Sequence, residues 1–539
     1  MSRPAAVTPP PAVTGALFAG TGTLLRLALR RDRIMAPAWV LLLGLTAVSG
    51  AGTVDSLYDG PAARADLVRS VAANSSLRAM IGPVFGDSLG ALVTWRFIGF
   101  LALGAAAMSL LLVIRHTREE EESGRQELLS AARVGRRAPL AAALLTALTA
   151  NTALALIITA GLAGPTGSVT GALALGLAVG ATGTLFAGVA ALMAQLTESA
   201  RLARGLTAAV LGAAYGLRAA GDAGSADAAA GSSLLSWLSP LGWTAQVRPY
   251  TGERWWVLAL IATVAVLLCA LAHALTGRRD LGMSFLPTRP GPATGRIATA
   301  GGLAWRLQRG SLIGWSVAFL VTGLAFGQLA DGAADLVRDS ENVRQIFERM
   351  GGRAGITDAF LAAMSGILGL VAAVYVVSSV LRLHTEETGR RAEPVLAHAV
   401  SRPRWATGHL VIAFGGAALI LLAAGAGLAL GHGDASVLAA PLTQLPAVWT
   451  LGAVTVLLYG VLPRFALAAW PLALLTLALG WIGPALDLPS WALQLSPFGH
   501  LPKIPGAAVE WTPLVVLTAL SMVLAGAGML GLRRRDLRV

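Results

Sequence analysis

The residues best suited to binding chemistry lie in an acidic stretch that interrupts an apolar sequence. The stretch HTREEEESGRQELLSAARVGR, residues 116–136, has four consecutive glutamates, a Gly-Arg pair and a further glutamate, Glu127. A second stretch, HTEETGRRAEPVLAHAVSR, residues 384–402, repeats this order with two glutamates, a Gly-Arg pair and Glu393. We call these the first and second cassettes. No catalytic set and no metal-ligand spacing accompanies them, so their chemistry is predicted to be docking.

Each cassette is predicted to contain a short surface helix that follows a sharp turn and ends in arginine. Gly124 and Gly389 would allow the turn, because glycine adopts backbone conformations that other residues avoid. In the second cassette Pro394 follows Glu393, which suits the first turn of a helix, where proline loses no hydrogen bond and a glutamate is favoured. In the first cassette an apolar face is predicted for Leu128, Leu129, Ala132 and Val134.

One cassette taken alone would be interpreted as a solvated loop whose charges anchor the ends of membrane spans. An anchor needs basic residues, however, and not four consecutive glutamates. Two anchors also have no reason to share a Gly-Arg pair and a following glutamate. The repetition therefore favours a surface that presses against another protein.

The elements that carry the cassettes are predicted to cross a membrane. Of the 539 residues 55% are hydrophobic and 13% are charged, and the mean hydropathy is +0.69. Apolar runs near 20 residues recur, which is the length that crosses a bilayer core of about 30 Å as a helix. The one cysteine, Cys269, excludes an intrachain disulfide. The sequence thus predicts an all-α polytopic membrane protein.

The sequence contains an internal tandem duplication, because five landmarks recur in the same order. They are LLRLALRRDR and LAWRLQRGS, LYDG and LADG, the two cassettes, LSPLGW and LSPFGH, and GRRDL and RRRDL. Six spans per half make 12 spans in two tandem parallel repeats. The predicted organisation is a disordered tail (1–20), a first six-helix repeat (21–281), a cytoplasmic linker (282–301) and a second six-helix repeat (302–539). The spans are predicted near 34–53, 92–115, 138–163, 169–196, 205–219, 254–276, 311–330, 358–382, 406–430, 440–462, 465–483 and 512–532.

Charge predicts the orientation of these spans. The side that holds both termini, both cassettes and the linker carries 29 basic and 12 acidic residues, whereas the other side carries 12 and 16. Because the basic side faces the cytoplasm, both termini and both cassettes are predicted to be cytoplasmic. The formal net charge of +13 therefore requires no nucleic acid partner. Amphipathic, arginine-bearing segments at 22–33 and 302–310 are predicted to lie on the membrane surface.

With these features the chain resembles the ABC-2-type transporter permeases, and in particular the long, internally duplicated permeases identified as exporters of polyketide-type antibiotics. The resemblance extends from about residue 20 to the end. It implies that the cassettes are coupling helices, each seated in a groove of a separate ATPase subunit that binds ATP and Mg, with two ATPase copies per chain. It also implies a hydrophobic or amphipathic cargo exported across the plasma membrane. The implied docking residues are Glu121, Glu122, Gly124, Arg125, Glu127, Glu386, Glu387, Gly389, Arg390 and Glu393.

Three further features of the sequence bear on this interpretation. A phosphate-binding loop needs the pattern G-x-x-x-x-G-K-[ST], and the only lysine, Lys503, follows Leu-Pro, so the chain is predicted not to hydrolyse ATP. The alternative function is a secondary transporter driven by an ion gradient, which would need ionisable side chains in mid-span. A second rival, a membrane-embedded transferase, would need a convergent polar site. Asn151 and Gln195 are predicted to bond between helices. The Ser-Pro-x-Gly stretches suit either gates near the outer face or simple turns.

Overall fold

The structure, a computed structural model, describes residues 17–73, 75–130, 133–224, 233–280, 282–286, 295, 299–338, 355–481 and 490–535. Within these ranges the regular elements are all helices. Most of the predicted tail 1–20, Ala132 and most of the predicted linker 282–301 lie outside them. The chain divides into two compact units, unit 1 (Met1–Pro290) and unit 2 (Gly291–Val539), and this boundary falls within the stretch that was predicted to be the linker.

The prediction of an all-helical polytopic membrane protein is confirmed. Ten helices in the described part of the chain are long and apolar enough to cross a membrane. Unit 1 contributes α3 (Met35–Leu57), α6 (Leu89–Arg115), α9 (Ala138–Thr166), α10 (Val169–Leu196) and α14 (Trp255–Thr276). Unit 2 contributes α15 (Ala300–Arg338), α17 (Ile356–Val380), α20 (Arg402–His432), α21 (Leu445–Val461) and α24 (Trp511–Arg534).

The two remaining predicted spans correspond to helices of a different character. The predicted span 205–219 lies within α11 (Ala200–Gly224), a 25-residue helix that carries four charged side chains, Arg201, Arg204, Arg218 and Asp222. The predicted span 465–483 corresponds to α22 (Ala469–Trp481), which has 13 residues. A membrane crossing by these two helices, and hence the total of 12, stays a prediction.

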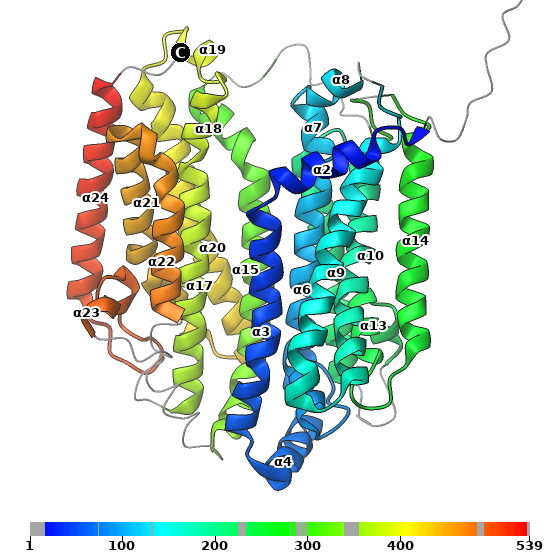
Figure 1. Cartoon of the computed structure of the whole chain (residues 1–539). Coiled ribbons are helices and arrows are strands. Elements are labelled where there is room, and N and C mark those ends of the chain that lie inside the picture. The colour runs from blue at the N-terminus through cyan, green and yellow to red at the C-terminus, as the bar shows by residue number, and fades with distance from the viewer. Residues whose placement is uncertain are drawn as a thin grey trace, which may run out of the picture. The chain divides into compact units, whose positions relative to one another are not determined.

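In unit 1, α10 is the central helix and packs against α6, α9 and α14 (Figure 1). Glycine lets it approach α9 closely, because a Cβ at Gly176 would lie 2.5 Å from the carbonyl oxygen of Ala155. Asn151 on α9 is buried and donates to the hydroxyl of Ser109 on α6 at 2.8 Å, which confirms the predicted bond between helices. In the sequence, α3 is followed by α4 (Gly60–Ala73) and α5 (Ser75–Met80) before α6 begins.

Both Ser-Pro-x-Gly stretches begin short helices. Ser239 precedes α13 (Pro240–Gln246), and its Oγ accepts from the amides of Leu241 and Gly242 while donating to the carbonyl of Ala214 at 2.6 Å. Ser496 precedes η4 (Pro497–His500) without a side-chain cap. A role in turning the chain is therefore visible, whereas a role as gates stays untested. Near them lie α12 (Leu234–Trp237) and α23 (Ser490–Leu493).

The two units begin differently. In unit 1 the amphipathic α2 (Thr21–Arg31) is separated from α3 by a turn at Asp32, which is 1% exposed, forms an ion pair with Arg115 at 2.9 Å and contacts His116. In unit 2 the corresponding segment 302–310 is continuous with its span in α15, and glycine stands at 310 where the turn would be. The remaining short helices of unit 2 are η1 (Ala435–Ala439), η2 (Pro441–Gln444) and η3 (Pro463–Ala468).

Candidate functional site

The first cassette folds as two short helices at the end of α6. These are α7 (Arg118–Glu122) and α8 (Arg125–Ser130) (Figure 1). Between them lies Gly124, whose φ is +72°. Glycine tolerates this left-handed conformation, and the amide of Gly124 donates to the carbonyl of Glu121 at 3.1 Å, as expected directly after a helix C-terminus. The predicted role of Gly124 in the turn therefore agrees with its conformation.

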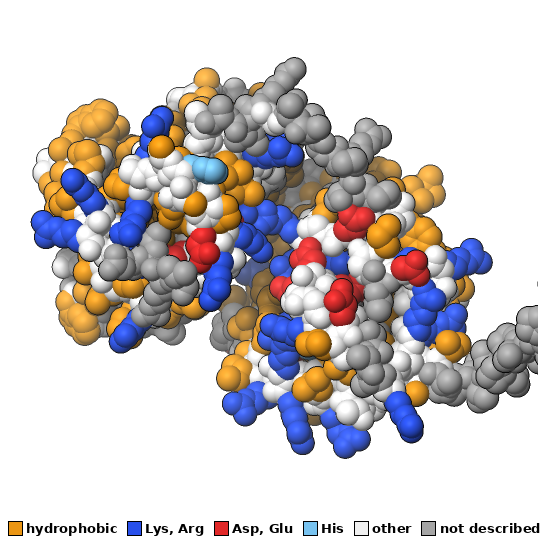
Figure 2. All heavy atoms as spheres, turned by 90° about the horizontal axis from the view of Figure 1, so that it is seen from above, with side chains coloured by type: hydrophobic (Ala, Val, Ile, Leu, Met, Phe, Trp, Pro, Cys, Tyr) orange, Lys and Arg blue, Asp and Glu red, His pale blue; other side chains and the backbone are white. Residues whose placement is uncertain are grey.

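Each of the four consecutive glutamates has its own partner within unit 1. The carboxylates reach the start of α11, the end of α2 and the residues after α14, and so gather three elements around α7. Over this end of unit 1, Figure 2 shows acidic side chains set among basic ones. The contacts are Glu119 with Arg204 at 2.5 Å, Glu120 with Arg31, Glu121 with Arg279 at 2.6 Å, and Glu122 with the amide of Ala200 at 2.7 Å.

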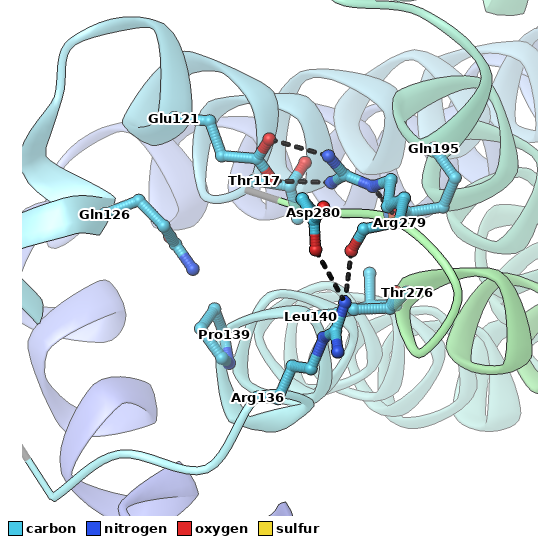
Figure 3. Close-up of a pocket in the computed structure, with 10 residues that line it drawn as sticks. All are labelled: Thr117, Glu121, Gln126, Arg136, Pro139, Leu140, Gln195, Thr276, Arg279 and Asp280. Atoms are coloured by element: carbon cyan, nitrogen blue, oxygen red, sulfur yellow. Dashed lines mark hydrogen bonds and ion pairs between the residues drawn. The ribbon is translucent and has the colours of Figure 1, made fainter. Parts of the chain in front are cut away.

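Glu121 has the most enclosed carboxylate of the four. Arg279 approaches it with two nitrogens, Nη2 to Oε1 at 2.6 Å and Nη1 to Oε2 at 3.0 Å, and this paired geometry is seen in Figure 3. Arg118 adds a third bond at 2.6 Å; it is 1% exposed and also donates to the carbonyl of Ala194 at 2.9 Å. Two parallel N–H···O bonds fix the plane of both groups and are stronger than a single neutral hydrogen bond.

The other end of the first cassette returns to the same arginine. Arg136 donates to the main-chain carbonyl of Arg279 and lies 3.9 Å from the carboxylate of Asp280 (Figure 3). Glu121, Arg136 and Arg279 line a small cavity of about 30 Å³, enough for about one water. Glu121 near the start of the cassette therefore binds the side chain of Arg279, and Arg136 at its end binds the backbone of the same residue.

The second cassette repeats this arrangement within unit 2. Arg535, which follows α24, donates to Glu387 through Nη2 at 2.7 Å and Nη1 at 3.0 Å. Tyr459 on α21 donates to the same carboxylate at 2.6 Å. Arg402, the last residue of the cassette, donates to the carbonyl of Arg535 at 2.5 Å. The side chain and backbone of Arg535 are thus held as those of Arg279 are.

The predicted turn residue of the second cassette is wrong by one position. α18 (Arg382–Thr388) has Gly389 as its C-cap residue, with a φ of −83°, and the left-handed residue is Arg390 with φ +56°. The amide of Arg390 donates to the main-chain carbonyl of Glu387, and the amide of Arg391 donates to that of Glu386. These are the paired bonds of a Schellman turn, in which the residue after the C-cap is left-handed. Glycine stands one residue too early to be that residue.

The ten predicted docking residues fall into buried and exposed groups. Glu121, Glu386 and Glu387 have largely buried side chains, and Glu386 pairs with Arg382 at 2.8 Å. These carboxylates position their own half of the chain and do not face outward. The residues that lie exposed are Glu122, Arg125, Glu127, Gly389, Arg390 and Glu393, with Gly124 half-buried.

Apolar residues of the cassettes follow the same division. Leu129 and Val134 pack against Leu24 on α2 and Ala138 on α9, which confirms part of the predicted apolar face, whereas Leu128 is 78% exposed. In unit 2, α19 (Glu393–Leu396) begins at Glu393 with Pro394 in its first turn, as predicted. Each cassette therefore presents a short exposed tip that rests on a fastened base.

Sequence reasoning missed the arginines that hold the cassettes. Arg279 and Arg535 were noticed only as parts of the repeated RRDL landmark, and Arg136 and Arg402 only as the last residues of the cassettes. The signal was present, because both halves retain a glutamate, a terminal arginine and the RRDL arginine. Within the described ranges, no group of three His, Cys, Asp or Glu residues is arranged to hold a metal ion.

Comparison with known proteins identifies the family. Residues 297–533 match the family model of the C-terminal domain of the multidrug efflux system permease Rv1217c. The chain is 44% identical over 536 residues to the multidrug efflux system permease protein Rv1217c of Mycobacterium tuberculosis (strain ATCC 25618 / H37Rv), a match that covers 97% of this chain and 96% of that protein. With ten apolar helices of spanning length and this relationship, the chain is a multi-pass membrane protein that belongs to the family of multidrug efflux system permeases.

Proposed function

We propose that the chain is the membrane subunit of an ATP-driven exporter of the ABC-2 type, and that its two cassettes are coupling helices for two copies of a separate ATPase. ATP and Mg are bound by that partner and not by this chain. The cargo is a hydrophobic or amphipathic compound, with polyketide-type antibiotics as the first candidates. The chain lies in the plasma membrane with both termini in the cytoplasm, in contact with lipid and without nucleic acid.

One observation carries this proposal. Each half fastens a cassette to its own helices and leaves a small charged tip exposed, Arg125 and Glu127 in unit 1 and Arg390 and Glu393 in unit 2. A tip on a fixed base suits transmission, because a load applied to it reaches the base without being absorbed by a loose loop. Export then requires the ATPase to bind two states of the permease with different free energies.

The ion-gradient alternative has one observation in its favour. His409, inside α20, is 2% exposed and contacts Gln308 of α15 at 3.0 Å, and a buried ionisable group within a span is what proton coupling requires. Against it, the carboxylates found in the ten apolar helices lie near helix ends, such as Asp55 in α3 and Asp358 in α17.

The test is to purify the permease with the ATPase encoded beside it and to weigh the complex by native mass spectrometry. One chain with two ATPase copies is expected. Arg125→Glu together with Glu393→Arg should release the ATPase, whereas the control Asp434→Arg, at an exposed residue outside the cassettes, should retain it. Normal export by the tip variant, combined with loss of export on adding a proton uncoupler or with His409→Gln, would instead establish the alternative.

A further inference from the structure

In each half of the chain, one arginine beyond the last apolar helix is held at two points by the cassette of that half. In unit 1, Glu121 binds the guanidinium of Arg279 and Arg136 binds its carbonyl. In unit 2, Glu387 binds the guanidinium of Arg535 and Arg402 binds its carbonyl. We call these the first and second clamps.

Each clamp takes two of its three residues, the arginines, from matched positions of the internal repeat. Arg279 and Arg535 are the arginines directly before the aspartate of the GRRDL and RRRDL landmarks, and Arg136 and Arg402 are the final arginines of the cassettes. The glutamates differ by one position, because Glu121 stands three residues before the cassette glycine and Glu387 two. The halves differ elsewhere, for example in the number of glutamates and in the break between α2 and α3. Retention of the same three-residue chemistry in both indicates that it serves the function shared by the halves.

The geometry of the clamps suits the transmission of force. The side chains of Arg279 and Glu121 are 7% and 8% exposed, and those of Arg535 and Glu387 are 13% and 6% exposed. Exposed ion pairs contribute little and exchange readily, whereas breaking a buried pair leaves an uncompensated charge. Because the side chain and the carbonyl are held separately, the residue can neither rotate nor slide without losing a bond.

Each clamp also contacts the helix that corresponds to the fourth predicted span of its half. Arg279 donates to the side chain of Gln195 at 2.6 Å, and Arg118 donates to the carbonyl of Ala194, both at the end of α10. In unit 2, Tyr459 of α21 donates to Glu387. α10 and α21 occupy the fourth predicted span of their halves. The clamps therefore join the cassette, the fourth span and the last span at one end of each unit.

We propose that the two clamps are the links through which movement of each cassette displaces the last span of its half, α14 or α24, and that Arg279 and Arg535 are positioning residues for export. The inference rests on the proposed function, in which the ATPase moves the cassettes. The clamps keep the last span in step with the cassette although some 150 residues separate them in the chain.

The test compares Arg279→Gln and Arg535→Gln with Arg278→Gln and Arg534→Gln, whose exposed arginines are sequence neighbours of the clamps. Export of a fluorescent hydrophobic dye and ATP hydrolysis are measured on the purified complex in vesicles. We expect the clamp variants to retain the ATPase and hydrolyse ATP but to export at least tenfold less dye per ATP. The neighbouring variants should match the wild type. The exchange Glu121→Arg with Arg279→Glu should restore part of the export lost in Arg279→Gln.

A distance measurement separates failure of this inference from failure of the proposed function. Cys269 is the only cysteine, so a Cys269→Ala chain accepts spin labels at Leu128→Cys and Arg278→Cys, or at Glu393→Cys and Arg534→Cys. A narrow distance distribution in the wild type that broadens on Arg279→Gln or Arg535→Gln is expected whether or not an ATPase is present. Unchanged distributions, or broadened ones with undiminished export, would overturn the clamps as transmission links. A wild type that binds no ATPase refutes the proposed function and the inference that rests on it. A wild type that binds the ATPase and exports dye leaves the clamp variants to decide the inference alone.

Discussion

Alanine at position 460 should force apart the two helices that set the position of Arg535. Gly460 on α21 faces Gly528 on α24, and a Cβ at residue 460 would lie 1.9 Å from the carbonyl oxygen of Gly528 and 2.7 Å from its carbonyl carbon. Both obstacles are backbone atoms, so no side chain can rotate away to make room. Without a hydrophobic driving force between helices in lipid, such close approach of small residues is a main source of helix association.

The magnitude follows from the geometry. An ordinary contact begins near 3.4 Å, so the new methyl group needs about 1.5 Å more room than the structure provides. Overpacking of this kind costs about 1–3 kcal/mol of unfolding free energy. Arg535 lies seven residues beyond Gly528, about 10 Å along the helix axis, and its bonds to Glu387 are 2.7 and 3.0 Å long. A shift of this size at Gly528 is therefore expected to weaken the second clamp as well.

The assay is the free energy of unfolding in mixed detergent micelles, compared among the wild type, Gly460→Ala and Gly526→Ala. Gly526 lies on the same helix as Gly528 but has no atom within 4 Å of a Cβ position, so its alanine variant should match the wild type or exceed it slightly. If Gly460→Ala unfolded at the same free energy as Gly526→Ala, the close contact of α21 with α24 would be refuted.

Three other perturbations test local features. Gly124→Ala should lower the unfolding free energy by about 1–2 kcal/mol because the φ of Gly124 is +72°. Arg390→Gly should be neutral or stabilising because Arg390 occupies the same left-handed region with a φ of +56°. Thermal unfolding of both variants checks this, and equal losses of stability would contradict it. Tyr459→Phe removes the hydroxyl that donates to the buried Glu387 and should cost about 1–3 kcal/mol in the same measurement, and no change would show that this bond contributes nothing. Burial raises the pKa of Asp222, which lies beyond the predicted span 205–219, against the opposing effects of Ser236 and Arg218. A raised pKa gives stability that is present below the ordinary aspartate pKa and lost as the pH rises through the raised value, so the wild type should lose unfolding free energy relative to Asp222→Asn over that interval; parallel pH profiles would exclude this.

What could be predicted from the sequence was local or repeated. Apolar length predicted the helices, because a span must satisfy its backbone internally, and Pro394 predicted the start of α19. Charge on α11 and the short length of α22 left the fifth span of each half undecided. The partners of Glu121 and Glu387 could not be predicted, because they lie 158 and 148 residues away and helical periodicity reports only neighbours three or four positions apart. Gly389 was wrongly predicted to be the turn residue, because the left-handed position is the one after the C-cap and in the second cassette that position is Arg390.

The four glutamates of the first cassette and the two of the second suggest unequal docks for a partner. The contacts argue otherwise, because the carboxylates of the acidic run bind residues of their own unit, among them Arg31, Arg204 and Arg279. One of the additional glutamates of unit 1, Glu120, binds Arg31 at the end of α2, whereas α15 continues into its span. Among the predicted docking residues, an arginine after glycine and the glutamate that follows it are exposed in both halves. Under the proposed function, two copies of one ATPase should therefore meet similar surfaces, and reversing the tip charges in either half should weaken ATPase binding to that half to a similar extent.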